Sequence, residues 1–168
     1  LPILFLPGDT YANRIPDPVL QQVEHFNNPG ITANDAFKPV TRYFDRITRP
    51  EQIIQSFPAA VQTMLDPADC GPACIALSQD IQGQTFDYPE EFFKEKIHAI
   101  RRPRPDEFQI KEAAEKIKSS KNPIIISGGG VFYSDAMEEL SNFAVKHNIP
   151  VTQTVMGYST MKRDHSHY

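Results

Sequence analysis

The sequence predicts an α/β protein with parallel sheets, arranged as two incomplete doubly wound domains. Short apolar runs that end in glycine or polar loops are typical of buried parallel strands, and they occur in "ILFLPGD", "GPACIALSQD" and "NPIIISGGG". Segments with helical apolar spacing separate these runs, which is the alternation of a doubly wound fold. We assign residues 1–99 to the first domain, 100–106 to a linker and 107–168 to the second domain.

The first element is a strand at the start of the chain, where "LPILFLPGDTY" opens with an apolar run. A central parallel strand needs a neighbour on both sides, and this sequence offers neighbours only downstream. We therefore expect an internal fragment of a longer chain, entered at a buried strand. The following "DTYANRIPDPVLQQVEHF" predicts a short helix that starts near Pro18, and "NNPGITANDAF" has the composition of a loop.

The middle of the first domain predicts a strand, a helix and a second strand. Alternation in "KPVTRYFDRI" indicates a strand near Lys38–Tyr43. Helical spacing follows in "EQIIQSFPAAVQTML", but Pro58 would cost a regular helix a hydrogen bond. We expect a turn begun at Pro50 and a main helix with Pro58 in its first turn. A buried strand at Ala73–Leu77 comes next, and "YPEEFFKEKI" predicts a short helix or a turn.

The second domain begins after "RRPRP", whose prolines and cations exclude the interior of a helix or strand. Asp106, with Gln109 three residues later, predicts an N-capping box, and Ser134 is expected to cap a second helix. "NPIIISGGGVF" and "NIPVTQTV" predict the two strands. The residues expected to face inward are Ile110, Ala113, Ala114 and Ile117 in the first helix and Met137, Leu140 and Ala144 in the second.

Composition indicates a soluble, globular, cytoplasmic protein, because 40% of residues are hydrophobic, 23% are charged and the net charge is -4. Nucleic acid is not expected as a partner. No apolar run approaches the roughly 18 residues that a membrane span needs. Cys70 and Cys74 are interpreted as ordinary reduced thiols, since a metal site there would have to recruit Asp66 or Asp69.

Polar residues near the predicted strands are the candidate ligand-binding groups. Asp35 and Asp80 lie where α/β proteins bind ligands, but capping a loop is the commoner role for such residues, and ligand binding is the alternative. His165 and His167 predict a tail or loop rather than a metal site, and the helical-stretch histidines, His25 and His98, are expected at the surface.

The glycine run Gly128–Gly130 follows a predicted strand and precedes a predicted helix. Such a loop can bring a phosphate to backbone N–H groups. The run lacks the spaced pattern of a dinucleotide site, so we prefer a glycine turn packed against a helix and keep nucleotide binding open.

Three stretches together resemble the thiamine-diphosphate-dependent enzymes of the acetolactate synthase type. They are "ILFLPGD", the segment from "NDAFKPVTRYFDRI" to "DPADCGPACIALSQDI", and "NPIIISGGGVFYSDAMEELSNFAVKHNIPVTQTV". The resemblance covers essentially the whole chain. It implies the second half of a pyrimidine-binding domain, followed by the start of a central Rossmann-like domain. Within the family, "NDAFKPV" and "DYPEEFF" are similar to a ring-opening branch that acts in myo-inositol catabolism, a part of carbohydrate metabolism.

That branch implies a hydrolase acting on a carbon–carbon bond of a cyclic dione, with 5-deoxyglucuronate as product. The resemblance further implies thiamine diphosphate and Mg²⁺, bound mainly by other parts of a homodimeric or homotetrameric parent. No catalytic residue or metal ligand is expected in this chain, because the activating glutamate lies upstream in the family, and the chain is not expected to be active alone. The alternatives are an acetolactate synthase or related 2-oxoacid carboxy-lyase, or a nucleotide-binding module that uses Gly128–Gly130.

Five residues match positions that approach the family's cofactor or substrate. Gly8 and Asp9 stand where the family has a strand-end Gly-Gln pair, with Asp in place of Gln. Asp35, Phe37 and Lys38 match the "DAFQ" loop, with Lys in place of Gln. A cation there would suit an enolate or a polyhydroxylated substrate. The alternative is that these residues only cap loops.

Overall fold

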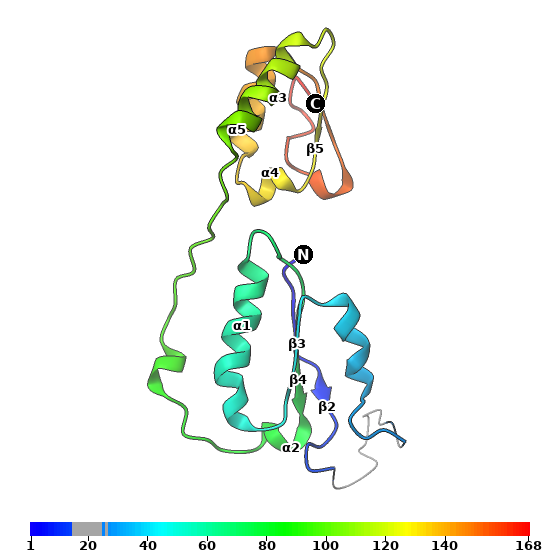
Figure 1. Cartoon of the computed structure of the whole chain (residues 1–168), viewed down its shortest axis with the longest axis vertical. Coiled ribbons are helices and arrows are strands. Elements are labelled where there is room, and N and C mark those ends of the chain that lie inside the picture. Colours follow the sequence, from blue (N-terminus) through cyan, green and yellow to red (C-terminus); the bar gives the residue numbers. More distant parts are fainter. Residues whose placement is uncertain (15–24, 26) are drawn as a thin grey trace. The chain divides into compact units, whose positions relative to one another are not determined.

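The computed structural model describes residues 1–14, 25 and 27–168, so the helix predicted near Pro18 lies outside the described residues. Its contacts divide the chain into two units, Leu1–Arg101 and Arg102–Tyr168. Each unit contains a parallel sheet beside helices (Figure 1). The predicted α/β class with parallel sheets is therefore confirmed.

The sheet of the first unit is built around β4 (Ala73–Ser78). β1 (Leu4–Phe5) and β2 (Gly8–Asp9) pair with β4 in one continuous register, so they are two parts of a strand interrupted at Leu6 and Pro7. β3 (Tyr43–Ile47) pairs with β4 on its other edge, and all pairings are parallel. The predicted strands at the chain start and at residues 73–77 are confirmed.

The prediction that the first strand is buried is wrong. Leu1 is 70% exposed and Ile3 is 53% exposed, and the side chains of Phe5 and Leu6 are exposed as well. Among the described residues, β1 pairs with β4 alone and has no strand on its outer edge. Side chains of a strand point alternately to the two faces of the sheet, and the described residues leave these apolar side chains uncovered.

The strand predicted at Lys38–Tyr43 is also wrong. Residues Ala33–Val40 form the 3₁₀ helix η1, and β3 begins only after it. Thr32 and Asp35 start η1 through a reciprocal capping box, in which each side chain accepts a hydrogen bond from the backbone near the other. Pro39 has no N–H to donate to a sheet ladder, which further disfavours a strand here.

The main helix of the first unit is α1 (Ile53–Leu65), preceded by the 3₁₀ turn η2 (Pro50–Gln52). The predicted division into two pieces is confirmed. Pro58 is the sixth residue of α1, so its predicted place in the first turn is wrong: the helix begins right after the turn. α1 lies along one face of the sheet (Figure 1). The core between them is formed by Ile47, Ala60, Ala73 and Ile75.

Two short helices complete the first unit. α2 (Gln79–Gln82) follows the end of β4, and the 3₁₀ helix η3 (Glu90–Phe93) forms within "YPEEFFKEKI", as predicted. Residues 95–106 are exposed and lie outside regular secondary structure.

The second unit contains α3 (Glu107–Ser119), β5 (Ile125–Ser127), α4 (Gly130–Tyr133), α5 (Met137–His147), β6 (Val151–Gln153) and the 3₁₀ helix η4 (Val155–Gly157). β5 and β6 pair in parallel, as the two predicted strands require. The core consists of Ala144, Val151 and Met161, with Ile125 and Leu140 packed against it. No helix in the described part of the chain is long and apolar enough to cross a membrane.

The helix caps of the second unit separate one confirmed prediction from one that is wrong. The Asp106 carboxylate accepts hydrogen bonds from the N–H groups of Phe108 and Gln109, so it caps α3, which is the Asp106 half of the predicted capping box. Ser134 does not cap α5, whose N-cap is Ala136. Ser134 instead ends α4, because its N–H donates to the carbonyl of Gly130.

The predicted apolar faces are only partly buried. Ala144 is fully buried and Leu140 packs on the core, but Met137 is 38% exposed. On α3, Ile110 and Ile117 are exposed, and no residue of this helix is buried. The inward face predicted for α3 is thus not covered by the described residues.

Candidate functional site

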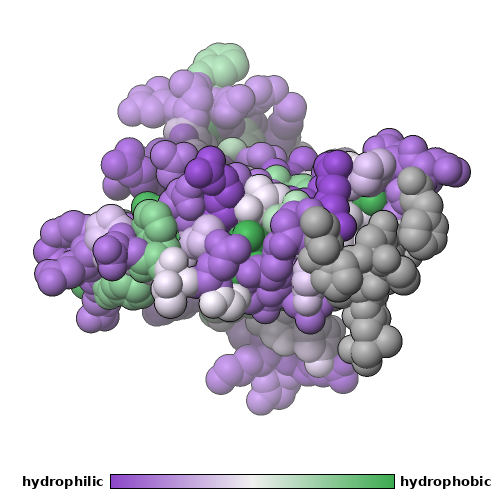
Figure 2. Space-filling model, turned by 90° about the horizontal axis from the view of Figure 1, so that it is seen from below, coloured by the Kyte–Doolittle hydropathy of each residue, from purple (hydrophilic) through white to green (hydrophobic). Residues whose placement is uncertain are grey.

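The carboxyl end of the first unit's sheet carries a connected group of charged side chains. Asp9 ends β2, Arg46 lies near the end of β3, and Asp35 and Lys38 are on η1. In parallel sheets the carboxyl ends of neighbouring strands meet at one edge, which is where α/β proteins bind ligands. This end of the strands points toward the viewer of Figure 2, which shows a mostly hydrophilic face.

Arg46 connects the two carboxylates. Its Nε donates to Asp9 Oδ2 at 2.6 Å, and its Nη2 donates to Asp35 Oδ2 at 2.7 Å and to Thr32 Oγ1 at 2.8 Å. Lys38 Nζ lies 2.5 Å from the other oxygen of Asp35. The exposed fraction of the side chain rises from 1% at Asp9 to 20% at Arg46 and 53% at Lys38. The charges therefore form a chain from the protein interior to its surface.

The electrostatics keep both members of the central ion pair charged. Burial raises the pKa of Asp35, but hydrogen bonds from Lys38, from the Thr32 N–H and from Arg46 outweigh it and hold the pKa well below its usual range. Burial lowers the pKa of Arg46, and its hydrogen bonds to Asp9 and Asp35 reverse this, so the net shift is upward. Each charge stabilises the ionised form of its partner.

The remaining predicted residues lie beside this group. The carbonyl of Gly8 accepts a hydrogen bond from Asn34 Nδ2 at 2.8 Å, which fastens β2 to η1. The ring of Phe37 meets the ring of Phe5 edge-on, with 4.7 Å between centroids. The structure thus places Gly8, Asp9, Asp35, Phe37 and Lys38 on β2 and η1, joined by these contacts and by Arg46. Their roles toward a cofactor or substrate stay predictions.

Arg46 and Thr32 were not singled out from the sequence. One feature of the sequence pointed to Arg46: a cation in a strand whose neighbours are partly buried requires a charged or polar partner. The identity of that partner was not visible, since Asp9 is 37 positions away in the chain. Thr32 carried a local signal, the spacing of Thr and Asp in a capping box.

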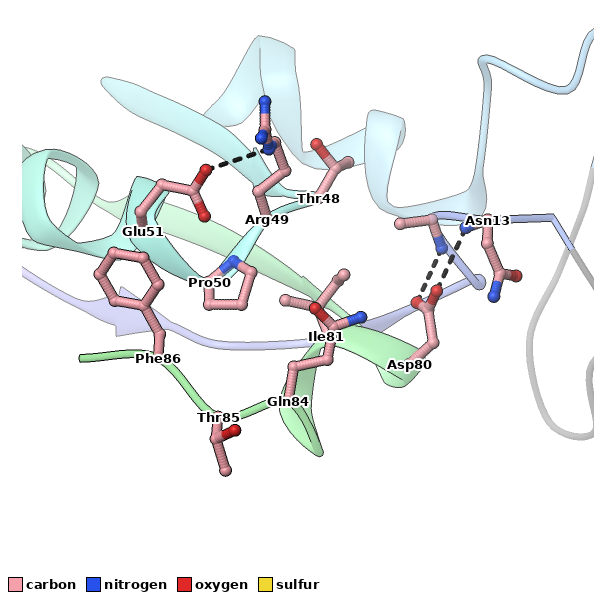
Figure 3. A pocket seen from close by; sticks show the side chains of 11 residues that line it. Asn13, Thr48, Arg49, Pro50, Glu51, Asp80, Ile81, Gln84, Thr85 and Phe86 are labelled. Atoms are coloured by element: carbon pink, nitrogen blue, oxygen red, sulfur yellow. Dashed lines mark hydrogen bonds and ion pairs between the residues drawn. The ribbon is translucent and has the colours of Figure 1, made fainter. Parts of the chain in front are cut away.

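Asp80 has the loop-capping role expected as the commoner one. Its two carboxylate oxygens accept hydrogen bonds from the N–H groups of Ala12 and Asn13, at 2.8 and 3.1 Å (Figure 3). It lines a pocket of about 600 Å³ next to the 3₁₀ turn η2, where Arg49 and Glu51 form an ion pair at 3.0 Å. The charged groups of this pocket are therefore already engaged with protein atoms.

The two histidines near the end of the chain make hydrogen-bond contacts within the second unit. His165 Nε2 lies 2.9 Å from Ser141 Oγ on α5, and His167 Nε2 lies 3.1 Å from Oδ1 of Asn148, the residue that follows α5. Both cysteines are free thiols, and burial, reinforced by the charge of Asp9, raises the pKa of Cys74. His25 and His98 are exposed, as expected. Within the described residues, no three His, Cys, Asp or Glu side chains are grouped to hold a metal ion.

Two of the three glycines in the run have neighbours at ordinary contact distance, and the choice between a packed turn and a nucleotide site stays a prediction. A Cβ added to Gly129 would lie 3.4 Å from the carbonyl oxygen of Met156, and one added to Gly128 would lie 3.7 Å from Thr154 Oγ1. The helix that follows, α4, has only four residues. Such a short helix has little dipole to offer a phosphate.

Comparison with known proteins identifies the family. Residues 110–168 match the family described as thiamine pyrophosphate enzyme, central domain. The chain is 52% identical, over 98% of its length, to the 3D-(3,5/4)-trihydroxycyclohexane-1,2-dione hydrolase of Clostridium perfringens, and it covers 26% of that protein. Residues 110–168 therefore belong to the thiamine pyrophosphate enzymes, and nearly the whole chain is similar to one part of such an enzyme.

A second relative and a solved structure are also similar to this chain. The protein of the same name from Bacillus licheniformis is 51% identical over 98% of the chain, which again covers 26% of it. The thiamine diphosphate-dependent 4-hydroxybenzoylformate decarboxylase of Rhodococcus jostii RHA1 superposes with a TM-score of 0.66 at 21% identity, over 90% of this chain and 27% of that one. This likeness shows a shared fold. The chain spans about a quarter of the length of the curated relatives.

Proposed function

We propose that this chain is part of a longer enzyme that opens the ring of 3D-(3,5/4)-trihydroxycyclohexane-1,2-dione by hydrolysing a carbon–carbon bond. The product would be 5-deoxyglucuronate, in the cytoplasmic degradation of myo-inositol. The observation that carries the proposal is the 52% identity to a hydrolase of that name, sustained over 98% of the chain. At this level of identity, relatives commonly keep both fold and reaction.

The charged group at the sheet edge is our candidate for the substrate-facing part of this chain. Lys38 is its most exposed member, and its ammonium could pair with the oxygens of a polyhydroxylated dione or of an enolate formed from it. Phe37 would line the same region, and Gly8 would allow close approach of the backbone. Asp9 is 1% exposed, so its role would be to hold other residues rather than to touch substrate.

Thiamine diphosphate and Mg²⁺ are the cofactors implied by the family. The described residues do not fit a Mg²⁺ site, because no three potential ligands are grouped together. The acidic side chains at the sheet edge are already paired with Arg46 and Lys38. We therefore propose that both cofactors bind mainly to other parts of the parent enzyme.

The rest of the parent polypeptide is the first partner we propose for this chain. The exposed apolar residues of β1 and the uncovered face of α3 offer surface for it to cover. A homodimer or homotetramer of the parent would follow the pattern expected from the family resemblance.

The test is turnover by the full-length enzyme. We expect the enzyme to consume the cyclic dione and to release the open-chain acid, which mass spectrometry would detect. This turnover should require added thiamine diphosphate and Mg²⁺. Pyruvate is the matched control substrate, since an acetolactate synthase would consume it. Turnover that persists after both cofactors are removed, or that occurs with pyruvate and not with the dione, would contradict the proposal.

A further inference from the structure

We infer that Arg46 is a positioning residue that orients Lys38 through the Asp35 carboxylate. The inference rests on the proposed function, because it takes Lys38 as the group that faces the substrate. It adds a residue that neither the sequence motifs nor the family resemblance singled out.

The first argument is the division of the Asp35 oxygens. Oδ2 accepts from Arg46 Nη2 at 2.7 Å and from the Thr32 N–H at 2.7 Å, so the carboxylate is held at one oxygen by two donors. Oδ1 is then the oxygen that meets Lys38 Nζ at 2.5 Å. With one oxygen fixed, the plane and direction of the carboxylate are fixed, and so is the place where the ammonium binds.

The second argument is the anchoring of Arg46 itself. Its Nε donates to Asp9, whose carboxylate is almost fully buried and also accepts from the Thr10 N–H at 2.8 Å. Its Nη2 also donates to Thr32 Oγ1. A guanidinium with donors in a planar fork can satisfy these acceptors at once, which a single ammonium cannot.

The third argument is the aromatic ring under both cations. Phe44 lies on β3, with Lys38 Nζ 5.2 Å and Arg46 Cζ 5.9 Å from its ring centroid. These distances are within the range of a cation–π contact. Lys38 is thus restrained from two sides, by the carboxylate that Arg46 holds and by the ring on which Arg46 also lies.

The fourth argument is charge balance. Asp9 and Asp35 carry two negative charges, and Arg46 and Lys38 carry two positive ones. Without Arg46, the single ammonium of Lys38 would face the uncompensated charge of two carboxylates, one of them buried. Lys38, which is already paired with Asp35, would then be held there more tightly and would be less available to a substrate.

The experiment is a double-mutant cycle in the full-length enzyme, with Arg46→Met, Lys38→Met and the double variant. A residue that acts through another loses its effect once the other is gone. We expect kcat to fall about 10-fold in each single variant, with KM changing less, and the double variant to match Lys38→Met within about 2-fold. If the two effects multiply instead, Arg46 does not act through Lys38 and the inference is overturned.

Arg46→Lys covers the case in which Arg46→Met fails to fold. It keeps the positive charge beside Asp9 but cannot also donate to Asp35 and Thr32, so we expect near-normal melting with the same loss of kcat. Full kcat in Arg46→Lys would overturn the inference. Arg42→Met is the matched control, because Arg42 lies just before β3 in an exposed ion pair with Asp69 at 3.5 Å. We expect it to leave kcat unchanged.

A second readout separates this inference from the proposed function. The rate at which an acetylating reagent modifies Lys38 can be measured by mass spectrometry without turnover. We expect it to fall about 3-fold in Arg46→Met, because the lysine loses a neighbouring positive charge. If the enzyme does not open the dione but the rate falls, the proposed function fails and the positioning survives; an unchanged rate overturns the positioning.

Discussion

At the scale of single residues, Asp35 makes stability depend on pH. Its carboxyl has an ordinary pKa of 3.8, and in the folded protein the pKa is lower because of Lys38, the Thr32 N–H and Arg46. A group whose pKa is lowered by folding stabilises the protein above its unfolded value, and this contribution is lost as the pH falls toward the folded value. The stabilisation is thus fully present at pH 7 and decreases below about pH 4.

Asp35→Asn tests this dependence. The variant removes the charge that holds Arg46 and Lys38, so we expect a loss of about 1–3 kcal/mol of unfolding free energy at pH 7. The difference from the wild type should shrink when unfolding is measured below pH 4. Asp69→Asn is the control, since its exposed pair with Arg42 is worth less than about 0.5 kcal/mol. A difference that stays constant with pH would exclude the ion pairs as its cause.

At the residue scale, the sequence drew attention to residues of a local motif and not to contacts between distant positions. The "DAFK" stretch drew attention to Asp35 and Lys38, which the structure joins in an ion pair. Arg46 was overlooked, although it makes most of the contacts in the group, because its partner Asp9 is on another strand. Strand alternation gives the face on which a side chain lies, but not the residue that it meets.

At the scale of elements, the two helix starts of the second unit predict different costs of mutation. Asp106 accepts two backbone N–H groups at the start of α3, whereas Ser134 makes no cap for α5. We expect Asp106→Ala to lower stability by about 1 kcal/mol. Ser134→Ala should change it by less than about 0.3 kcal/mol, since no cap is lost. Thermal unfolding of both variants would measure the contrast, and equal losses would refute it.

The element η4 contains the most crowded glycine of the second unit. A Cβ on Gly157 would lie 2.1 Å from the backbone oxygen of Ser127, so the ends of β5 and η4 could not keep their spacing. We expect Gly157→Ala to cost about 1–3 kcal/mol or more by overpacking. Gly130→Ala is the matched control, because no described atom lies within 4 Å of its Cβ position. It should be neutral or stabilising by up to about 1 kcal/mol in unfolding experiments.

Element boundaries show why local signals must be ranked against each other. The alternation of "KPVTRYF" favoured a strand, yet the capping box of Thr32 and Asp35 and the missing N–H of Pro39 produced η1. β4 was predicted almost to its last residue, because an apolar run between polar loops has no competing pattern. Ser134 has the chemistry of an N-cap, but its backbone N–H donates to the Gly130 carbonyl, so it ends α4 instead.

At the scale of the whole molecule, the two units are joined by an exposed segment without regular structure. Residues 95–106 are all exposed, and the division between the units falls within it, between Arg101 and Arg102. That residues 100–106 act as a linker between two independent units stays a prediction. Proline at 103 and 105 keeps this stretch extended and out of helices.

Limited trypsin digestion of the full-length enzyme tests the linker at a single bond. Trypsin cleaves poorly before proline, so Arg101–Arg102 is the susceptible bond of "RRPRP", since Pro103 and Pro105 protect the next two. We expect it to be cut about tenfold faster than the bonds after Arg42 and Arg46, which lie in or beside a paired strand. Arg101→Gln should abolish this early cut while leaving the rest of the digestion pattern unchanged. Equal cleavage at all three arginines would mean that the segment is covered in the parent enzyme and does not behave as a linker.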